Sequence, residues 1–173
     1  MYSNLTHDIK NMDLWEAGMK GIMKVRLQDI PAKHKCEHEG YEYYKRELVP
    51  AGEHHQCIIS VYEIPPGKSA YPYHYHTSNE EAFYILSGTG SLKTPYGEMK
   101  VTAGDFIFFP AGEKGAHRLT NISQTDKLIY LDFDTSNEID VAFYPDSGKI
   151  GVWGKNINQV YRIGDQVGYY DGE

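Results

Sequence analysis

The feature that most constrains this chain is a regular alternation between short apolar runs and turn-forming residues. From about Tyr41 to Tyr144, runs rich in β-branched and aromatic residues are separated by Gly, Pro, Asn and Ser at intervals of about ten residues. No long helical period interrupts them. Such spacing is typical of antiparallel sandwiches and barrels, so the sequence predicts an all-β barrel of the jelly-roll type. The predicted strands are 41–48, 56–64, 73–76, 81–87, 90–94, 98–102, 105–109, 116–121 and 127–134.

The predicted barrel divides the 173-residue chain into three parts. We expect an N-terminal extension over residues 1–40, the barrel over 41–145 and a C-terminal extension over 146–173. The first extension is expected to pack on the barrel or on a partner subunit, and its residues 12–23 have the apolar spacing of a short amphipathic helix. Short strands are expected in the second extension, around Trp153 and over 159–163.

Two of the predicted strands are apolar on both faces. They are Ala82-Phe83-Tyr84-Ile85-Leu86 and Phe106-Ile107-Phe108-Phe109, whereas a strand with one face in water alternates apolar and polar residues. Something must therefore cover their outer faces, either the first forty residues of the chain or a second subunit. We favour a homodimer, because two-fold dimers are the commonest soluble oligomers.

The charge balance narrows the class of partner. Lys and Arg number 17 against 24 Asp and Glu, a formal net charge of -7 without a dense basic run, which disfavours nucleic acid and anionic membranes as partners. The sequence also shows neither a secretory signal pattern nor an apolar stretch of membrane-spanning length. We therefore expect a cytoplasmic protein with a small-molecule ligand. Cys36 and Cys57 are too few for a disulfide framework and are predicted to be reduced, buried thiols.

The most informative segment for function runs from Gly67 to Gly88. Side chains two residues apart on a strand point to the same face, so His74 and His76 can converge on one point while Tyr73 faces away. After a four-residue loop, Glu81 begins the next strand, where its carboxylate can close on the same centre. A second block, from Gly104 to Asn121, brings His117 back on a return strand.

These two blocks resemble the two signature motifs of the cupin superfamily. His74 and His76 match the paired histidines of the first motif, and Glu81 matches its glutamate, with Gly88 at the expected distance. His117 matches the histidine of the second motif, followed by Asn121. The sequence departs from the shortest form of the second motif in one respect, because the four residues Glu-Lys-Gly-Ala separate Gly112 from His117 where that form has two.

The resemblance implies a double-stranded β-helix with one divalent metal ion on His74, His76, Glu81 and His117. Three neutral imidazoles and a carboxylate suit Fe, Mn, Ni, Co or Zn. An octahedral shell would keep two positions open, unlike the closed tetrahedral shell of structural zinc sites. Members of the superfamily with this ligand set include isomerases, dioxygenases and decarboxylases. We therefore expect a mononuclear metal enzyme acting on a small oxygen-rich metabolite; the alternative is a non-catalytic module that binds or senses a sugar-like ligand.

Further residues are expected near the ligand. Phe83 should point inward because it shares the parity of Glu81, Gln56 and Tyr62 are candidate partners behind the site, and Lys114 could attract an anionic substrate. His34, Cys36 and His38 also alternate, but they lie in the charged stretch 33–39, which predicts a solvated surface.

Overall fold

The computed structural model describes residues 22–52 and 55–173, so the helix expected over 12–23 falls almost entirely outside the described residues. The described part forms thirteen strands and three short 3-10 helices. The strands are β1 Lys33–His38, β2 Tyr41–Val49, β3 Cys57–Ile64, β4 Tyr75–His76, β5 Glu81–Ser87, β6 Thr89–Thr94, β7 Gly97–Thr102, β8 Phe106–Phe109, β9 Arg118–Asn121, β10 Leu128–Thr135, β11 Ile139–Tyr144, β12 Lys149–Gly154 and β13 Ile157–Arg162. The 3-10 helices are η1 Leu27–Asp29, η2 Glu113–Gly115 and η3 Pro145–Ser147. Among the described residues, no helix has the length and apolar character needed to cross a membrane.

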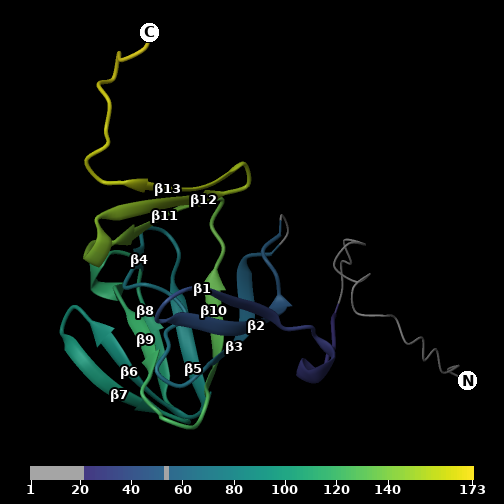
Figure 1. Ribbon diagram of the computed structural model, residues 1–173. Helices are drawn as coiled ribbons and strands as arrows, with labels where there is room; N and C mark the ends of the chain where they lie inside the picture. Colours follow the sequence, from purple (N-terminus) through teal and green to yellow (C-terminus); the bar gives the residue numbers. More distant parts are fainter. Residues whose placement is uncertain (1–21, 53–54) are drawn as a thin grey trace, which may run out of the picture.

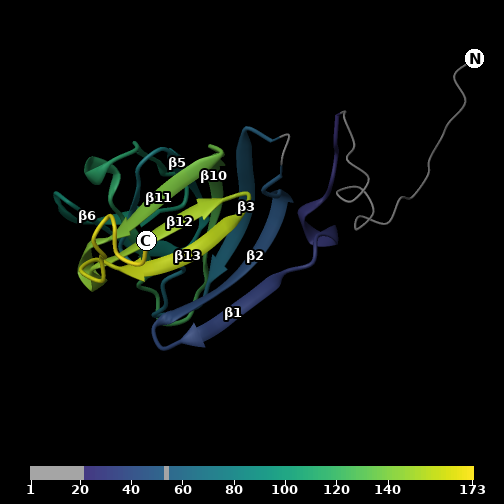
Figure 2. The same ribbon diagram turned by 90° about the horizontal axis from the view of Figure 1, so that it is seen from above.

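The strands form three sheets in which neighbours are often distant in sequence. The largest has the order β1-β2-β3-β10-β5-β8, a second has the order β7-β6-β9, and a third has the order β13-β12-β11-β4. All strand pairs are antiparallel. Strands β11, β12 and β13 lie across one end of the barrel that the other strands form (Figure 1 and Figure 2). This is the double-stranded β-helix predicted from the sequence.

The core follows from the alternation along each strand. In β8 the side chains of Ile107 and Phe109 pack inward, whereas Phe106 and Phe108 point outward. In β10 the buried positions are Leu128, Tyr130 and Asp132, which makes the inner face partly polar. The principal core side chains are Tyr43, Tyr62, Ile64, Phe83, Ile85, Leu92, Val101, Phe109, Leu119, Leu128 and Tyr130.

Two residues of the sequence motifs, Asn121 and Gly88, have structural roles. Asn121 is fully buried, and its side-chain amide donates hydrogen bonds of 2.8 Å to the backbone oxygens of Ile64 and Asp126. It thereby ties the end of β9 to the end of β3 and to the turn before β10. Gly88 has φ +88°, and a Cβ there would collide with the backbone oxygen of Lys127. A glycine is therefore required where the chain leaves β5.

The sequence missed two strands, β1 and β11. Residues of β1 are exposed at all six positions, as expected for a solvated surface, yet they form an edge strand paired with β2. The predicted strand 73–76 shortens to Tyr75–His76, because His74 forms only an isolated bridge with His117. Strands β12 and β13 agree with the strands expected around Trp153 and 159–163. The prediction that both cysteines are buried is wrong, because Cys36 is exposed on β1 and Cys57 is only partly buried.

The outer face of β5, β8 and β10 exposes a group of large apolar side chains. Phe106 is 67% exposed and Phe108 53%, and they lie opposite Tyr84 and Ala82 in the register of β5 and β8. Phe133, on β10, lies on the far side of Ala82 and is 40% exposed. Strand β1, from the predicted N-terminal extension, lies at the opposite edge of this sheet and does not cover the group.

Candidate metal centre

Backbone pairing brings the two histidine segments together. His74 donates its backbone N–H to the backbone oxygen of His117 at 3.1 Å, and His117 donates back at 2.8 Å. The ring centroids of His74 and His117 are consequently 4.8 Å apart. His76 follows on β4, two residues after His74, and its ring lies 5.1 Å from that of His74. The predicted alternation brings His74 and His76 together and backbone pairing adds His117, so three imidazoles lie close to one point.

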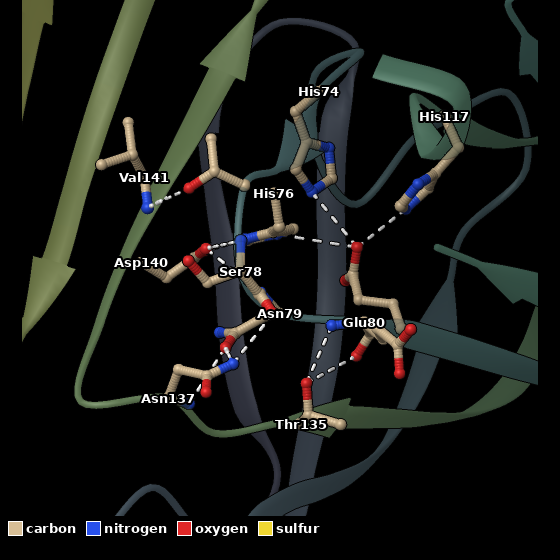
Figure 3. Close-up of polar contacts among 12 residues, drawn as sticks. His74, His76, Ser78, Asn79, Glu80, His117, Thr135, Asn137, Asp140 and Val141 are labelled. Atoms are coloured by element: carbon tan, nitrogen blue, oxygen red, sulfur yellow. Dashed lines mark hydrogen bonds and ion pairs between the residues drawn. The ribbon is translucent and has the colours of Figure 1, made fainter. Parts of the chain in front are cut away.

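A single carboxylate oxygen faces all three rings. Glu81 begins β5, and its Oε2 lies 3.4 Å from Nε2 of His117, 3.6 Å from Nε2 of His76 and 3.9 Å from Nε2 of His74. The three labelled rings in Figure 3 point toward that oxygen. The structure thus brings together all four residues that the sequence singled out as candidate ligands.

The other nitrogen of each ring is engaged by a fixed acceptor. Nδ1 of His74 donates to the backbone oxygen of Pro72 at 2.8 Å, and Nδ1 of His117 donates to that of Gly115 at 2.9 Å. Nδ1 of His76 bonds to a carboxylate oxygen of Asp140. Because carbonyl and carboxylate oxygens only accept, each Nδ1 carries the proton and each Nε2 presents its lone pair to the centre.

Burial keeps the imidazoles in the form that binds metal. His74 is 7% exposed and His117 2%. Burial, reinforced by the neighbouring His76, lowers the pKa of His74 to about 4. Burial, with the neighbouring His74, likewise lowers the pKa of His117 well below its usual value. Both rings are therefore neutral at physiological pH, as a metal ligand must be.

The chemistry of these groups fits a divalent transition metal. Nε2 of His117 is buried and has no hydrogen-bond partner among the described residues, an arrangement that costs free energy unless an ion accepts the lone pair. Ligand atoms of His74, His76 and Glu81 lie within 4.8 Å of one another. Phe109 stacks on the His117 ring with centroids 3.7 Å apart, and Phe83 meets the same ring edge-on at 5.3 Å, so aromatic walls fix this ligand in place.

Asp140 orients His76 from the neighbouring strand β11. It is 2% exposed, and its Oδ1 accepts backbone N–H groups from Ser78 at 2.9 Å and Asn79 at 3.2 Å. Figure 3 shows the Asp140 carboxylate facing both the His76 ring and the backbone at Ser78. Burial alone would raise the pKa of Asp140, but the hydrogen bond from His76, with the two backbone donors, holds that pKa below its usual value.

We expect the substitution Asp140→Asn to weaken metal binding about 10- to 100-fold while leaving the fold intact. The amide keeps the size of the carboxylate but loses the charge that makes the His76 ring a stronger donor. A competitive titration against a chelator measures the affinity. Asp146→Asn is the matched control, because Asp146 is half exposed and pairs with Lys93 at 2.7 Å away from the centre. Equal metal affinity in wild type and Asp140→Asn would remove this role from Asp140.

The other residues that the sequence predicted near the ligand differ in how deeply they are buried. Phe83 is inward and 4% exposed, and Tyr62 is inward and 2% exposed, with its hydroxyl 2.9 Å from that of Tyr71. Lys114 is exposed on η2, three residues before His117. Gln56 is exposed ahead of β3, where its backbone oxygen accepts from Ser136. Phe83 is thus in contact with a candidate ligand, whereas Gln56 and Lys114 lie toward the surface.

Sequence reasoning missed the inward-facing acids. Asp132 and Asp134 share the inner face of β10 with Tyr130, and their period-two spacing was a usable signal once this strand was recognised. Asp140 gave no comparable signal, since 64 residues separate it from His76.

Comparisons with known proteins agree with this geometry. The family model for the cupin domain matches residues 60–134, a stretch that runs from β3 to β10 and contains all four candidate ligands. Residues 60–134 of this chain form a cupin domain. A search of curated proteins found no match to this cupin.

Several solved cupin structures are similar over most of the chain. A proposed sugar phosphate isomerase from Acidithiobacillus ferrooxidans is 27% identical, with 83% of this chain and 94% of that one covered and a TM-score of 0.73. A predicted oxalate decarboxylase from Thermotoga maritima is 26% identical, with 66% and 100% covered and a TM-score of 0.59. A sugar phosphate isomerase from Silicibacter pomeroyi, at 22% identity, 81% and 92% coverage and a TM-score of 0.73, shares the fold.

Proposed function

We propose that this cupin binds one divalent transition-metal ion, of Fe, Mn, Ni, Co or Zn, on His74, His76, Glu81 and His117 and acts on a small oxygen-rich metabolite. The observation that carries the proposal is the convergence of three Nε2 lone pairs on the Glu81 carboxylate, with every Nδ1 proton held by its own acceptor. When bound, the ion would supply Lewis acidity toward a carbonyl or hydroxyl oxygen. Three imidazoles and one carboxylate would suit a catalytic ion, because structural zinc sites are typically rich in cysteine.

The residues around the centre support binding of a polar molecule. Phe83 and Phe109 pack against His117 and exclude water from that side. Tyr144 stacks on His74, with ring centroids 5.9 Å apart. Relatives named for sugar phosphate isomerisation and oxalate decarboxylation support isomerase and decarboxylase chemistry, and an iron ion would add dioxygen chemistry. A cytoplasmic location is part of the same proposal.

The experiment that tests this function is a turnover screen on metal-loaded protein. Sugar phosphates, keto acids, oxalate and diols are incubated with wild type, with and without dioxygen, and followed by NMR. We expect one class to be consumed by wild type and by His34→Gln, a surface histidine on β1, but not by His117→Gln. A ligand that binds tightly to the metal-loaded protein and is never consumed would favour the non-catalytic sugar-binding alternative.

We also propose that the cupin is a homodimer in which a second copy covers the outer face of β5, β8 and β10. Exposed apolar side chains are gathered there on three adjacent strands, and a cluster of this kind on a monomer marks an interaction surface. The face lies on the outside of the sheet that bears Glu81, so a partner can cover it without blocking the centre.

A further inference from the structure

Glu81 is part of the histidine centre and also belongs to a group of three inward-facing acids. Asp134 lies directly opposite Glu81 in the register of β10 and β5, and Asp132 lies opposite Phe83. All of these side chains are on the inner face of the barrel. One carboxylate oxygen each from Glu81, Asp132 and Asp134 lies within 4.8 Å of the others. Three potential negative charges thus share one small volume.

Polar atoms aimed into this volume lack partners. Ser60 is 1% exposed and lies directly opposite Asp132 in the register of β3 and β10, so its side chain shares the inner face. Its Oγ has no hydrogen-bond partner among the described residues, and neither do Oδ1 of Asp132 and Oδ1 of Asp134. Buried hydroxyl and carboxylate oxygens are normally satisfied, so three in one place indicate a missing positively charged or donating species.

The protein supplies too little positive charge to neutralise these three acids. Lys45 is the lysine whose charge acts on both aspartates. Its Nζ lies 3.5 Å from Oε1 of Glu47 and 5.4 Å from the centre of the Tyr62 ring, so it is already engaged by another carboxylate. One shared lysine does not balance three inward carboxylates, and burial raises the pKa of each of them, so the group holds protons when no cation is bound.

We propose that Asp132, Asp134, Glu81 and the hydroxyl of Ser60 form a second cation site, for a hard divalent ion such as Mn²⁺, Mg²⁺ or Ca²⁺. All of its ligand atoms are oxygens, the donors that hard cations prefer, in contrast with the nitrogen-rich histidine centre. Glu81 then belongs to both sites and links the two ions. The site rests on the proposed function only through this shared glutamate, because its other three residues take no part in the histidine centre.

Mn²⁺ is a suitable probe, since it binds both oxygen-rich and imidazole-containing sites. Chelator-stripped protein is dialysed against Mn²⁺ and its metal content is measured by mass spectrometry, with electron paramagnetic resonance on the same samples. The variants are Asp132→Asn and Asp134→Asn for the acidic site and His117→Gln for the histidine centre, and Asp146→Asn is the surface control. The asparagine variants keep the side-chain size and remove mutual repulsion, so we expect them to fold.

We expect about two Mn²⁺ ions per chain in wild type and Asp146→Asn, and about one in each of the other variants. Spin coupling between two ions should appear only in the proteins that hold both. One ion per chain that Asp132→Asn retains and His117→Gln loses would overturn the second site and leave the proposed function standing. One ion that His117→Gln retains and Asp132→Asn loses would support the acidic site and overturn the histidine centre. No bound ion in wild type would overturn both, and shared protons would then explain the acidic group.

Discussion

The substitution His117→Gln is expected to abolish metal binding at the histidine centre. The loss of affinity should exceed the roughly 100-fold loss expected when an orienting partner is removed. His117 is 2% exposed and Phe109 lies against its ring, so no water or neighbouring side chain can move in to replace the lost ligand. Glutamine offers a weaker donor on a more flexible stem. The remaining three ligands would hold an ion with a lower coordination number and with less selectivity between metals.

The measurement is metal content of untagged protein purified without chelator, combined with thermal unfolding before and after metal addition. Wild type should gain about 4 kcal/mol in unfolding free energy when the free ion is at a thousand times its dissociation constant. His117→Gln should gain less than wild type, and His34→Gln, which changes an exposed histidine, should behave as wild type. A His117→Gln protein that binds as much metal as wild type and gains the same stability from it would remove His117 from the centre.

The double substitution Phe106→Ser with Phe108→Ser is expected to convert a dimer into a monomer without destabilising the barrel. Both rings point away from the core and are 67% and 53% exposed, so the monomer loses little buried apolar surface. In the dimer they would be the most exposed aromatic side chains of the covered face, and truncation of one anchoring aromatic side chain costs about 2 kcal/mol or more. Two such losses weaken association by about a thousandfold.

Sedimentation velocity over a range of concentrations measures this change. Wild type should sediment as a dimer at micromolar concentration and the double variant as a monomer with an unchanged circular dichroism spectrum. Tyr96→Ser is the control, because Tyr96 is 77% exposed on the hairpin between β6 and β7, away from the proposed interface. A monomeric wild type, or a double variant that stays dimeric, would contradict the assignment of this face.

Much of the barrel was predictable because its strands carry their own signals. From Glu81 to Ser87 the predicted and observed bounds coincide, since Gly88 ends an apolar run that begins at a loop. Strand β1 was missed because its sequence, Lys-His-Lys-Cys-Glu-His, is polar on both faces. It forms an edge strand by backbone pairing with β2, which needs no apolar face. Local patterns cannot reveal a strand of that kind.

The candidate ligands were predictable for a similar reason. His74, His76 and Glu81 lie within eight positions of one another, so strand alternation alone brings the first two together. The partners that orient them were not predictable. The acceptors of His74 and His117 are backbone oxygens, which any residue supplies, and Asp140 reaches His76 only through the pairing of β4 with β11. Tertiary pairing between distant segments decides these contacts.

The position of His76 also bears on when the centre can form during protein synthesis. His76 lies on β4, which is held by β11, whereas Glu81 lies on β5 in the six-stranded sheet. All four proposed ligands have left the ribosome once residue 117 emerges, yet β11 and Asp140 follow more than twenty residues later. A nascent chain that ends before β11 would carry every ligand without the strand that aligns His76. We therefore expect the ion to be acquired only after the C-terminal strands have been translated and folded.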